Sequence, residues 1–343
     1  MIKIDGLILE EIRDLVNSLG EPTYRGDQIY KWVYSKAVND FDMMSDLSKE
    51  FRKKIKEVAA FTDFTLLELK ESKRDLSLKG LFLLEDGEKI ESVILKDADR
   101  HTLCVSTQVG CRMGCKFCNT AQVGFKRDLT TSEIIRQVLF MKKVLEDKGG
   151  KLTNIVYMGM GEPLDNIDNV IRSLEILTDE NGVGFSHRKI TVSTSGVVNH
   201  LDKLFSMKKV VNLAVSLNAT TDGVRSRIMP INNRFPINTL LSKLKQLPLQ
   251  KRKRITIEYV MLKGVNDTIE DAKRVVQLLK GLPVKINLIV YNQTIGGEYK
   301  SSDEDVVLNF QKYLTDRNFT VFIRKSLAAD IDGACGQLYA KYI

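Results

Sequence analysis

Residues 111–118 read CRMGCKFC, which brings Cys111, Cys115 and Cys118 together in one short segment. The chain has only five cysteines in 343 residues, so three of them at this spacing do not indicate a chance arrangement. Structural zinc needs four closed ligands, and the nearest further donors are Cys104 and His101. Three thiolates instead suit a [4Fe–4S] cluster whose fourth iron stays open for a substrate. The motif therefore predicts an iron–sulfur cluster, with a zinc site as the alternative.

Strand-like and helical segments alternate from about residue 100 onward. Helical patterns cover 132–146, 169–177, 268–279 and 304–314, and Thr130 with Glu133 forms a capping box before the first of them. Such alternation is typical of parallel strands joined by right-handed crossovers. Six or seven repeats predict an α/β fold with a closed or partial barrel, whose strands lie at 102–108, 154–158, 189–194, 211–217, 255–262, 284–291 and 320–324.

The N-terminal part differs from the rest in pattern and charge. Helical patterns at 8–19, 28–36 and 47–58 precede strand-like stretches at 65–69, 76–84 and 89–95. Residues 1–85 carry 14 Lys and Arg against 16 Asp and Glu, whereas residues 86–343 carry 38 against 28. We expect an accessory unit with a strand hairpin over 1–85, a barrel over 86–325 and a C-terminal segment over 326–343.

Composition excludes several classes of protein. Hydrophobic residues make up 43% and charged residues 28%, as in ordinary globular proteins. No apolar run approaches the roughly 18 residues of a membrane helix, and the acidic N-terminus is unlike a secretion signal. A cytoplasmic protein without a membrane partner is expected. The net charge of +8 allows a polyanionic partner without proving one.

The cysteine motif and several other segments resemble the RlmN/Cfr family of radical S-adenosylmethionine (SAM) RNA adenine methyltransferases. The resemblance implies a partial TIM-like radical SAM barrel with a small, mainly helical, RNA-binding domain at the N-terminus. It also implies one [4Fe–4S] cluster on Cys111, Cys115 and Cys118, with SAM bound to the open iron. The segments that carry it are LGEPTYRGDQIYKWVY, TLCVSTQVGC, GMGEPLDN, RKITVSTSG, RSRIMPIN, EYVMLKGVND, KINLIVYN and DIDGACGQL.

Polar residues recur where the predicted strands end, which is where parallel α/β barrels place their chemistry. Singly, each is typical of a turn or a helix cap, but together they favour a ligand site. The family often has His where this chain has Asn218; both donate a hydrogen bond, but only His titrates. The resemblance assigns SAM binding to Gly161, Glu162, Ser193, Ser216, Leu217, Asn218 and Asn292.

The resemblance also assigns catalytic roles to Cys335, Cys104 and Glu91. Adenine C2 is a poor nucleophile, whereas a thiolate can accept a methyl group from SAM. Cys335 would carry that methyl, a radical from a second SAM would activate it, and the resulting carbon radical would join the adenine. Cys104 would then resolve the protein–RNA link as a Cys104–Cys335 disulfide forms, and Glu91 would accept the ring proton. The alternatives are that Cys335 is an incidental thiol, that Cys104 is only a core cysteine, and that Glu91 faces the surface of its strand.

The expected product is 2-methyladenosine in 23S rRNA at the peptidyl-transferase centre, with the adenosine 3′ of a tRNA anticodon as second substrate. Pro163 and Ser195 favour this branch over C8 methylation, the antibiotic-resistance alternative. A non-enzymatic zinc protein that binds RNA is the alternative of another class. The resemblance further implies a monomer and an electron donor such as flavodoxin or ferredoxin. Candidate RNA contacts are Lys251–Arg254, Lys126, Arg127 and a patch of Tyr24, Arg25, Lys31 and Trp32.

Overall fold

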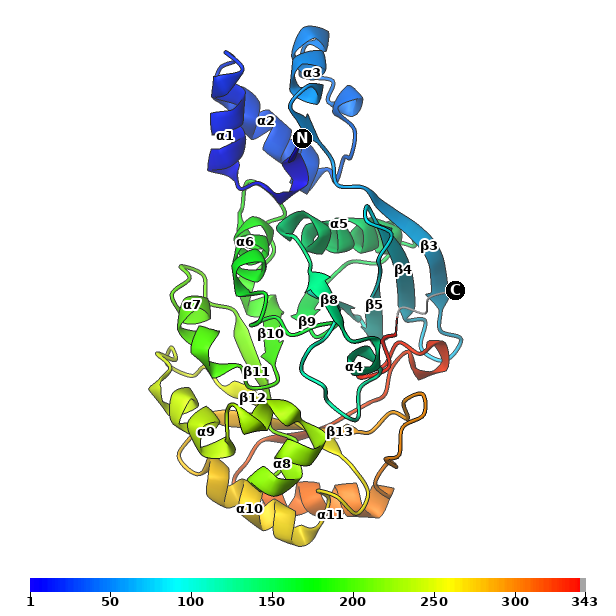
Figure 1. The fold of residues 1–343 in the computed structure, drawn as a ribbon, viewed down its shortest axis with the longest axis vertical. Helices are drawn as coiled ribbons and strands as arrows, with labels where there is room; N and C mark the ends of the chain where they lie inside the picture. The colour runs from blue at the N-terminus through cyan, green and yellow to red at the C-terminus, as the bar shows by residue number, and fades with distance from the viewer. Residues whose placement is uncertain (340–343) are drawn as a thin grey trace.

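One sheet of ten strands runs through the molecule in the order β14-β13-β12-β11-β10-β9-β6-β5-β4-β3. The computed structural model describes residues 1–339 (Figure 1). Within this sheet, the seven strands from β6 to β14 pair in parallel. Strands β14 and β3 form the two open edges of the sheet, so the barrel is partial. These parallel strands are β6 (Arg100–Cys104), β9 (Asn154–Tyr157), β10 (Ile190–Thr194), β11 (Asn212–Ser216), β12 (Ile255–Met261), β13 (Val284–Val290) and β14 (Val321–Arg324).

Helices connect successive parallel strands, and the predicted α/β barrel is confirmed. The capping box expected before the first of them is present: Thr130 N donates to Glu133 Oε2 at 2.8 Å, and Glu133 N donates to Thr130 Oγ1 at 3.3 Å. Together the two bonds satisfy amides that would otherwise lack a partner at the helix start. The helices are α5 (Thr131–Asp147), α6 (Ile167–Thr178), α7 (Leu201–Phe205), α8 (Asp222–Ile228), α9 (Ile237–Gln246), α10 (Ile269–Leu279) and α11 (Glu304–Thr315).

Three antiparallel strands extend the sheet beyond β6. They are β3 (Phe64–Glu71), β4 (Leu78–Leu84) and β5 (Lys89–Asp97), and β5 pairs directly with β6. The sheet therefore continues across residue 85, where we expected a domain boundary, because β4 and β5 are hydrogen-bonded to each other. We propose that the accessory unit ends earlier, between β2 (Ala59–Ala60) and β3.

The N-terminal unit contains β1 (Ile2–Lys3), α1 (Leu9–Ser18), α2 (Tyr24–Tyr30) and α3 (Lys49–Lys56), and β1 pairs with β2. It lies at one end of the molecule against α5 and α6 (Figure 1). Arg172 on α6 reaches Glu11 at 2.6 Å and also donates to the carbonyl of Gly6 at 3.3 Å. A π-helical turn, Lys31–Ser35, continues α2. Short 3₁₀ helices lie at Ile4–Gly6, Phe41–Met43, His187–Lys189, Val198–His200, Pro230–Asn233 and Ala329–Ile331.

A small antiparallel ribbon, β7 (Gln108–Gly110) with β8 (Phe125–Asp128), follows β6 and encloses the short helix α4 (Asn119–Val123). The CRMGCKFC motif occupies the loop between β7 and α4. Within residues 1–339, no helix has the length and apolar character needed to cross a membrane.

Candidate active site

The cysteine loop (residues 111–118) is held by its backbone at both ends. Cys111 N donates to Gly124 O at 3.1 Å, and a Cβ on Gly110 would lie 1.6 Å from that same oxygen. Position 110, with φ +73°, therefore accepts only glycine. Farther along the loop, Lys116 N donates to Ile228 O at the end of α8 at 2.9 Å. The loop is thus anchored to the barrel before any cofactor binds.

The three thiols of the loop lie close enough to affect one another electrostatically. Burial raises the pKa of Cys111 to about 12, and burial followed by the charges of Cys118 and Cys111 raises the pKa of Cys115. Such thiols are protonated unless a cation stabilises the thiolates, which is what a bound metal centre does.

The three thiols of the loop suit a cluster by their number and chemistry. Each thiolate of an iron–sulfur cluster binds a different iron, whereas a structural zinc takes four ligands on one ion. The donor set of Cys111, Cys115 and Cys118 therefore fits a three-cysteine cluster.

The C-terminal segment (residues 326–339) crosses the site and is anchored on the β3–β4 connection. Asp330 accepts hydrogen bonds from Ser72 Oγ at 2.8 Å and from Lys73 N at 3.1 Å. Asp75 accepts the amide of Ala328 at 2.8 Å. Figure 1 shows this segment, in red, beside β5 and α4.

A second set of bonds joins the C-terminal segment to α4. Asn119 N donates to Gly336 O at 2.7 Å, and Thr120 Oγ1 donates to Leu338 O at 2.8 Å. A Cβ on Gly336 would lie only 3.2 Å from Phe117 O. The backbone around Cys335 is therefore packed directly on the cysteine loop.

These anchors bring Cys335 and Cys104 together from opposite ends of the barrel sequence. Cys335 is exposed, its carbonyl accepts Asn292 Nδ2 at 3.3 Å, and its thiol interacts electrostatically with Cys118. Cys104 ends β6 and is buried; burial, and then the thiol of Cys335, raises its pKa to about 12. Cys104 of β6, Cys118 of the cysteine loop and Cys335 of the C-terminal segment thus lie close enough to interact electrostatically.

Glu91 is buried on β5 and faces the C-terminal segment. Its Oε1 lies 3.1 Å from Lys79 Nζ, and its Oε2 accepts the amide of Tyr339 at 2.8 Å. Lys79 also donates to the carbonyl of Asp332 at 3.2 Å. The carboxylate is therefore next to the Cys335 segment with its charge balanced by a buried lysine.

Gly161 and Glu162 follow β9 on the same side as the cysteine loop. Gly161 has φ +100°, and a Cβ there would lie 2.5 Å from Gln108 Cβ. Glu162 Oε2 accepts both the amide and the hydroxyl of Ser195 at 2.7 Å. Burial raises the pKa of Glu162, although the bonds from Ser195 oppose this. Glu162 also acts electrostatically on Cys111 and Cys115, so the GEP turn borders the cluster site.

The other residues assigned to SAM lie at the carboxyl ends of β10, β11 and β13. Ser193, Ser216 and Asn292 are half-buried, and Leu217 is fully buried. Asn218 has φ +53°, its Oδ1 accepts Val260 N at 2.8 Å, and its Nδ2 donates to Met229 Sδ at 3.2 Å. Its amide therefore fixes the turn after β11, and a second N–H of Nδ2 and a second lone pair of Oδ1 remain for a ligand.

Arg225 on α8 is a site residue that the sequence analysis did not identify. It is fully buried and donates to the carbonyls of Ser195 at 2.7 Å and of Ser216 and Leu217 at 3.0 Å. Burial lowers its pKa to about 10, and its interaction with Cys115 opposes that shift. One guanidinium thus ties the ends of β10 and β11 to the cysteine loop. An Arg in a short helix is usually exposed, so no sequence signal identified it.

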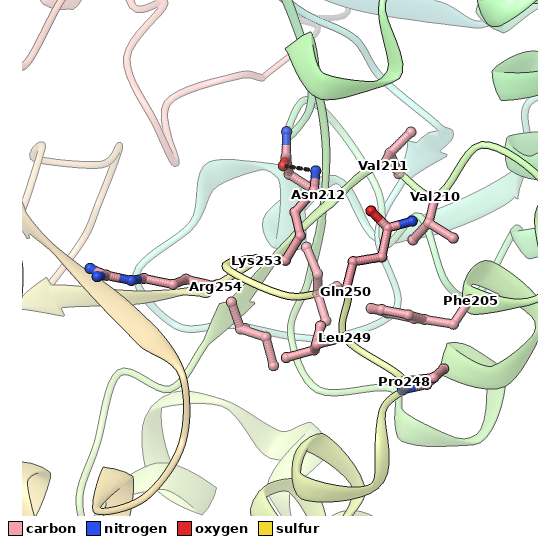
Figure 2. A pocket seen from close by; sticks show the side chains of 11 residues that line it. Phe205, Val210, Val211, Asn212, Pro248, Leu249, Gln250, Lys253 and Arg254 are labelled. Atoms are coloured by element: carbon pink, nitrogen blue, oxygen red, sulfur yellow. Dashed lines mark hydrogen bonds between the residues drawn. The ribbon is translucent and has the colours of Figure 1, made fainter.

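The basic residues that the sequence suggested as RNA contacts either lie away from the cysteine loop or form ion pairs. Lys251–Arg254 precede β12, at the amino end of the barrel, where Lys253 Nζ donates to Asn212 Oδ1 at 3.2 Å (Figure 2). The pocket drawn there holds about 20 Å³, roughly the space of one water. Lys126 pairs with Glu88 at 3.1 Å, and Arg127 pairs with Asp86 at 2.5 Å.

The aromatic patch expected on the N-terminal unit lies along one continuous helical stretch. Tyr24 is 53% exposed, with the Arg25 guanidinium 5.0 Å from its ring centroid. Lys31 is exposed, and Trp32 Nε1 donates to Asp46 Oδ1 at 2.6 Å. The patch thus offers both cations and aromatic faces.

Comparisons with known proteins agree with these features. Residues 2–61 match the ribosomal RNA large subunit methyltransferase N-terminal domain, and residues 105–279 match the radical SAM superfamily. The dual-specificity RNA methyltransferase RlmN of Geobacter sulfurreducens is 47% identical, covering 99% of this chain and 93% of that protein. RlmN of Geotalea uraniireducens is 46% identical over 98% of this chain and 96% of that protein. The crystal structure of a radical SAM methyltransferase from Sphaerobacter thermophilus superimposes with a TM-score of 0.95 at 37% identity, covering 99% of this chain and all of that one.

Proposed function

The chain belongs to the RlmN family of radical SAM RNA methyltransferases, and from that premise we propose that it methylates C2 of adenosine in 23S rRNA and of the adenosine 3′ of the anticodon in tRNA. It is an enzyme, so the hypothesis of a non-enzymatic zinc protein is wrong. The observation that carries the proposal is the packing of the Cys335 segment on the cysteine loop and α4, where Asn119 N donates to Gly336 O at 2.7 Å and a Cβ on Gly336 would lie 3.2 Å from Phe117 O. The electrostatic interactions of the thiols of Cys335, Cys104 and Cys118 agree with it.

The cofactors in this proposal are SAM and a [4Fe–4S] cluster held by Cys111, Cys115 and Cys118. When bound, the cluster supplies the electron that cleaves SAM to a 5′-deoxyadenosyl radical. The strand-end residues Gly161, Glu162, Ser193, Ser216, Leu217 and Asn292 would surround SAM, with Asn218 holding the turn beside it. An electron donor such as flavodoxin or ferredoxin and a monomeric enzyme complete the proposal.

The protein's own residues then handle the methyl group. Cys335 is exposed as a residue, but burial around its sulfur raises the pKa of the thiol to about 12. Once deprotonated, the thiol can accept a methyl from SAM and present it to an RNA base. Glu91 accepts the proton that leaves the ring carbon, supported by its position against the Cys335 segment. Once the methyl carbon is bonded to the ring, the Cys104 thiolate would attack the Cys335 sulfur. The S–C bond would break with its electron pair going to that carbon, which takes up a proton to become the methyl group, and the two thiols would be oxidised to a disulfide as the methylated base leaves.

The first experiment tests the product. Anaerobic protein reconstituted with iron and sulfide is incubated with 23S rRNA, SAM and a reductant, and digested nucleosides are analysed by mass spectrometry. We expect 2-methyladenosine. 8-Methyladenosine would retain the methyl-carrier chemistry and move the enzyme to the C8 branch. SAM cleavage without any methyladenosine would overturn the RNA substrate.

Two variants separate the cysteine roles. Cys335→Ala removes the methyl carrier, so methylation falls to background while the cluster absorbance stays. Cys104→Ala leaves the carrier but not the resolving thiol, so a covalent protein–RNA adduct accumulates on a denaturing gel. Normal turnover in either variant would show that the corresponding role is wrong.

A further inference from the structure

A second, open pocket lies at the carboxyl end of the barrel beside the cysteine loop. Its volume is about 440 Å³, and its walls come from the end of α8, the turn after β12 and the loop after β13. Because strands β12 and β13 are parallel, their carboxyl ends face the side on which the cysteine loop follows β6. The lining residues include Arg227, Lys263, Val265, Glu298, Tyr299 and Lys300.

The floor of this pocket continues into the cysteine motif. Val265 and Tyr299 pack on an apolar cluster built around Ile228 and Tyr291, and Phe117 and Cys115 pack on the same cluster. The bond from Lys116 N to Ile228 O, at 2.9 Å, places the backbone of Lys116 one residue from Arg227. A ligand in the pocket would therefore lie next to the proposed catalytic site.

Three cations, Arg227, Lys263 and Lys300, line this pocket; we call them the basic rim. Lys263 N donates to Lys300 O at 2.9 Å, so two of the three are held together by backbone, and Lys263 Nζ pairs with Asp303 at 2.6 Å. Arg227 and Lys300 are exposed and form no ion pair with any residue of the described part, 1–339. Glu298 contributes one opposing charge.

An aromatic side chain stands among these cations. Tyr299 is half-buried and close enough to Arg227 to sense its charge. Proteins usually bind single-stranded nucleic acid with cations that contact its phosphates and with aromatic side chains on which its bases stack. Of the basic groups proposed from the sequence, Lys251–Arg254 lie at the opposite end of the barrel, and Lys126 and Arg127 are ion-paired. The patch of Tyr24, Arg25, Lys31 and Trp32 lies on the N-terminal unit and would contact another part of the RNA.

We propose that the basic rim and Tyr299 bind the RNA strand beside the target adenosine, the cations on phosphates and the tyrosine ring on a neighbouring base. The inference rests on the proposed function and adds to it the surface that holds the substrate. It requires an unstacked strand, which the target adenosine also needs in order to reach the cysteines.

The test is the salt dependence of RNA binding. Arg227→Gln with Lys300→Gln removes two rim charges, so the slope of log affinity against log salt should fall by about 1.4, and affinity at 0.1 M salt about tenfold. The matched control is Lys208→Gln with Lys280→Gln, two exposed, unpaired lysines within residues 1–339 that precede β11 and β13 at the other end. The control should keep the wild-type slope.

Other readouts keep the outcomes distinct. SAM-dependent methylation of Cys335, followed by protein mass spectrometry, should be unchanged in the rim variant, which shows that it is folded. Tyr299→Leu should weaken binding about tenfold and Tyr299→Phe should not, because stacking uses the ring. The proposal that the rim binds RNA would be overturned if the rim variant kept the wild-type slope of log affinity against log salt, or if this slope fell equally in the rim and control variants. Wild-type protein that neither binds nor methylates RNA would instead overturn the proposed function, and the rim with it.

Discussion

At the scale of single residues, Arg225 joins the ends of β10 and β11 beside the cysteine loop. Its guanidinium bonds to carbonyls at the ends of two strands, and within residues 1–339 no carboxylate lies within ion-pair distance of it. A buried cation without such a partner is unfavourable on its own. Negative charge from thiolates bound to a cluster would compensate it, as its interaction with Cys115 indicates.

Arg225→Met should lower the free energy of unfolding by about 3–5 kcal/mol, because several buried carbonyls lose their donor at once. Urea denaturation of the cluster-free protein measures this. Arg225→Lys keeps the charge but not the planar fork, so it should recover less than half of the loss. Wild-type stability in the methionine variant would contradict the positioning role.

At the scale of elements, the C-terminal segment has little regular structure of its own and depends on its neighbours. Ala328 and Asp332 have positive φ, at +58° and +52°, which side chains from elsewhere must stabilise. Asp330 anchors one end through Ser72 and Lys73, and α4 anchors the other. The position of Cys335 is therefore set by bonds to β3–β4 and α4.

Asp330→Ala should speed hydrogen exchange at the amides of Asp332 and Gly333 about tenfold, because the loss of one anchor favours local opening. Exchange followed by mass spectrometry measures this on the cluster-free protein. Asp330→Asn keeps only one of the two oxygens that accept the bonds from Ser72 Oγ and Lys73 N, so its exchange should lie between that of the alanine variant and that of the wild type. Equal exchange in the alanine variant and wild type would show that the anchor is dispensable.

At the scale of the whole molecule, the N-terminal unit is joined to the barrel through Glu11 and Arg172. Partial burial disfavours the charged form of Glu11, but the bonds from Arg172 and from the amide of Ile8 outweigh it, so its pKa lies below the ordinary value. A lowered carboxyl pKa contributes stability above the unfolded pKa, and this is lost as pH falls through the folded pKa.

Arg172→Ala should therefore lower the free energy of unfolding by about 0.5–1 kcal/mol at pH 7. The difference should shrink as pH falls through the lowered pKa of Glu11, leaving the contribution of the bond from Arg172 to the carbonyl of Gly6. Urea denaturation across this pH range measures it. Glu11→Gln should show the same pH course, since it removes the other partner. A difference that stays constant with pH would mean that packing, and not the ion pair, joins the units.

Local patterns in the sequence were enough for most elements. All seven parallel strands, the cap at Thr130 and the helices α5, α6, α10 and α11 were predicted, because apolar periodicity and capping are short-range properties. α4 was missed because five residues are too short to show a period. α9 was also missed, although Ile237, Leu240, Leu241 and Leu244 have helical spacing that could have identified it.

The sequence by itself determined the barrel class, the cysteine motif and the family, since these depend on the order and spacing of residues. Only the tertiary structure decided that Lys79 meets Glu91 and that Arg225 meets two strand ends. It also decided that Lys126 and Arg127 are paired, while Arg227 and Lys300, distant in sequence, share one rim with Lys263. Local periodicity sets how a strand or helix forms, but burial and charge pairing depend on what packs against it, and that is fixed only when the chain closes on itself.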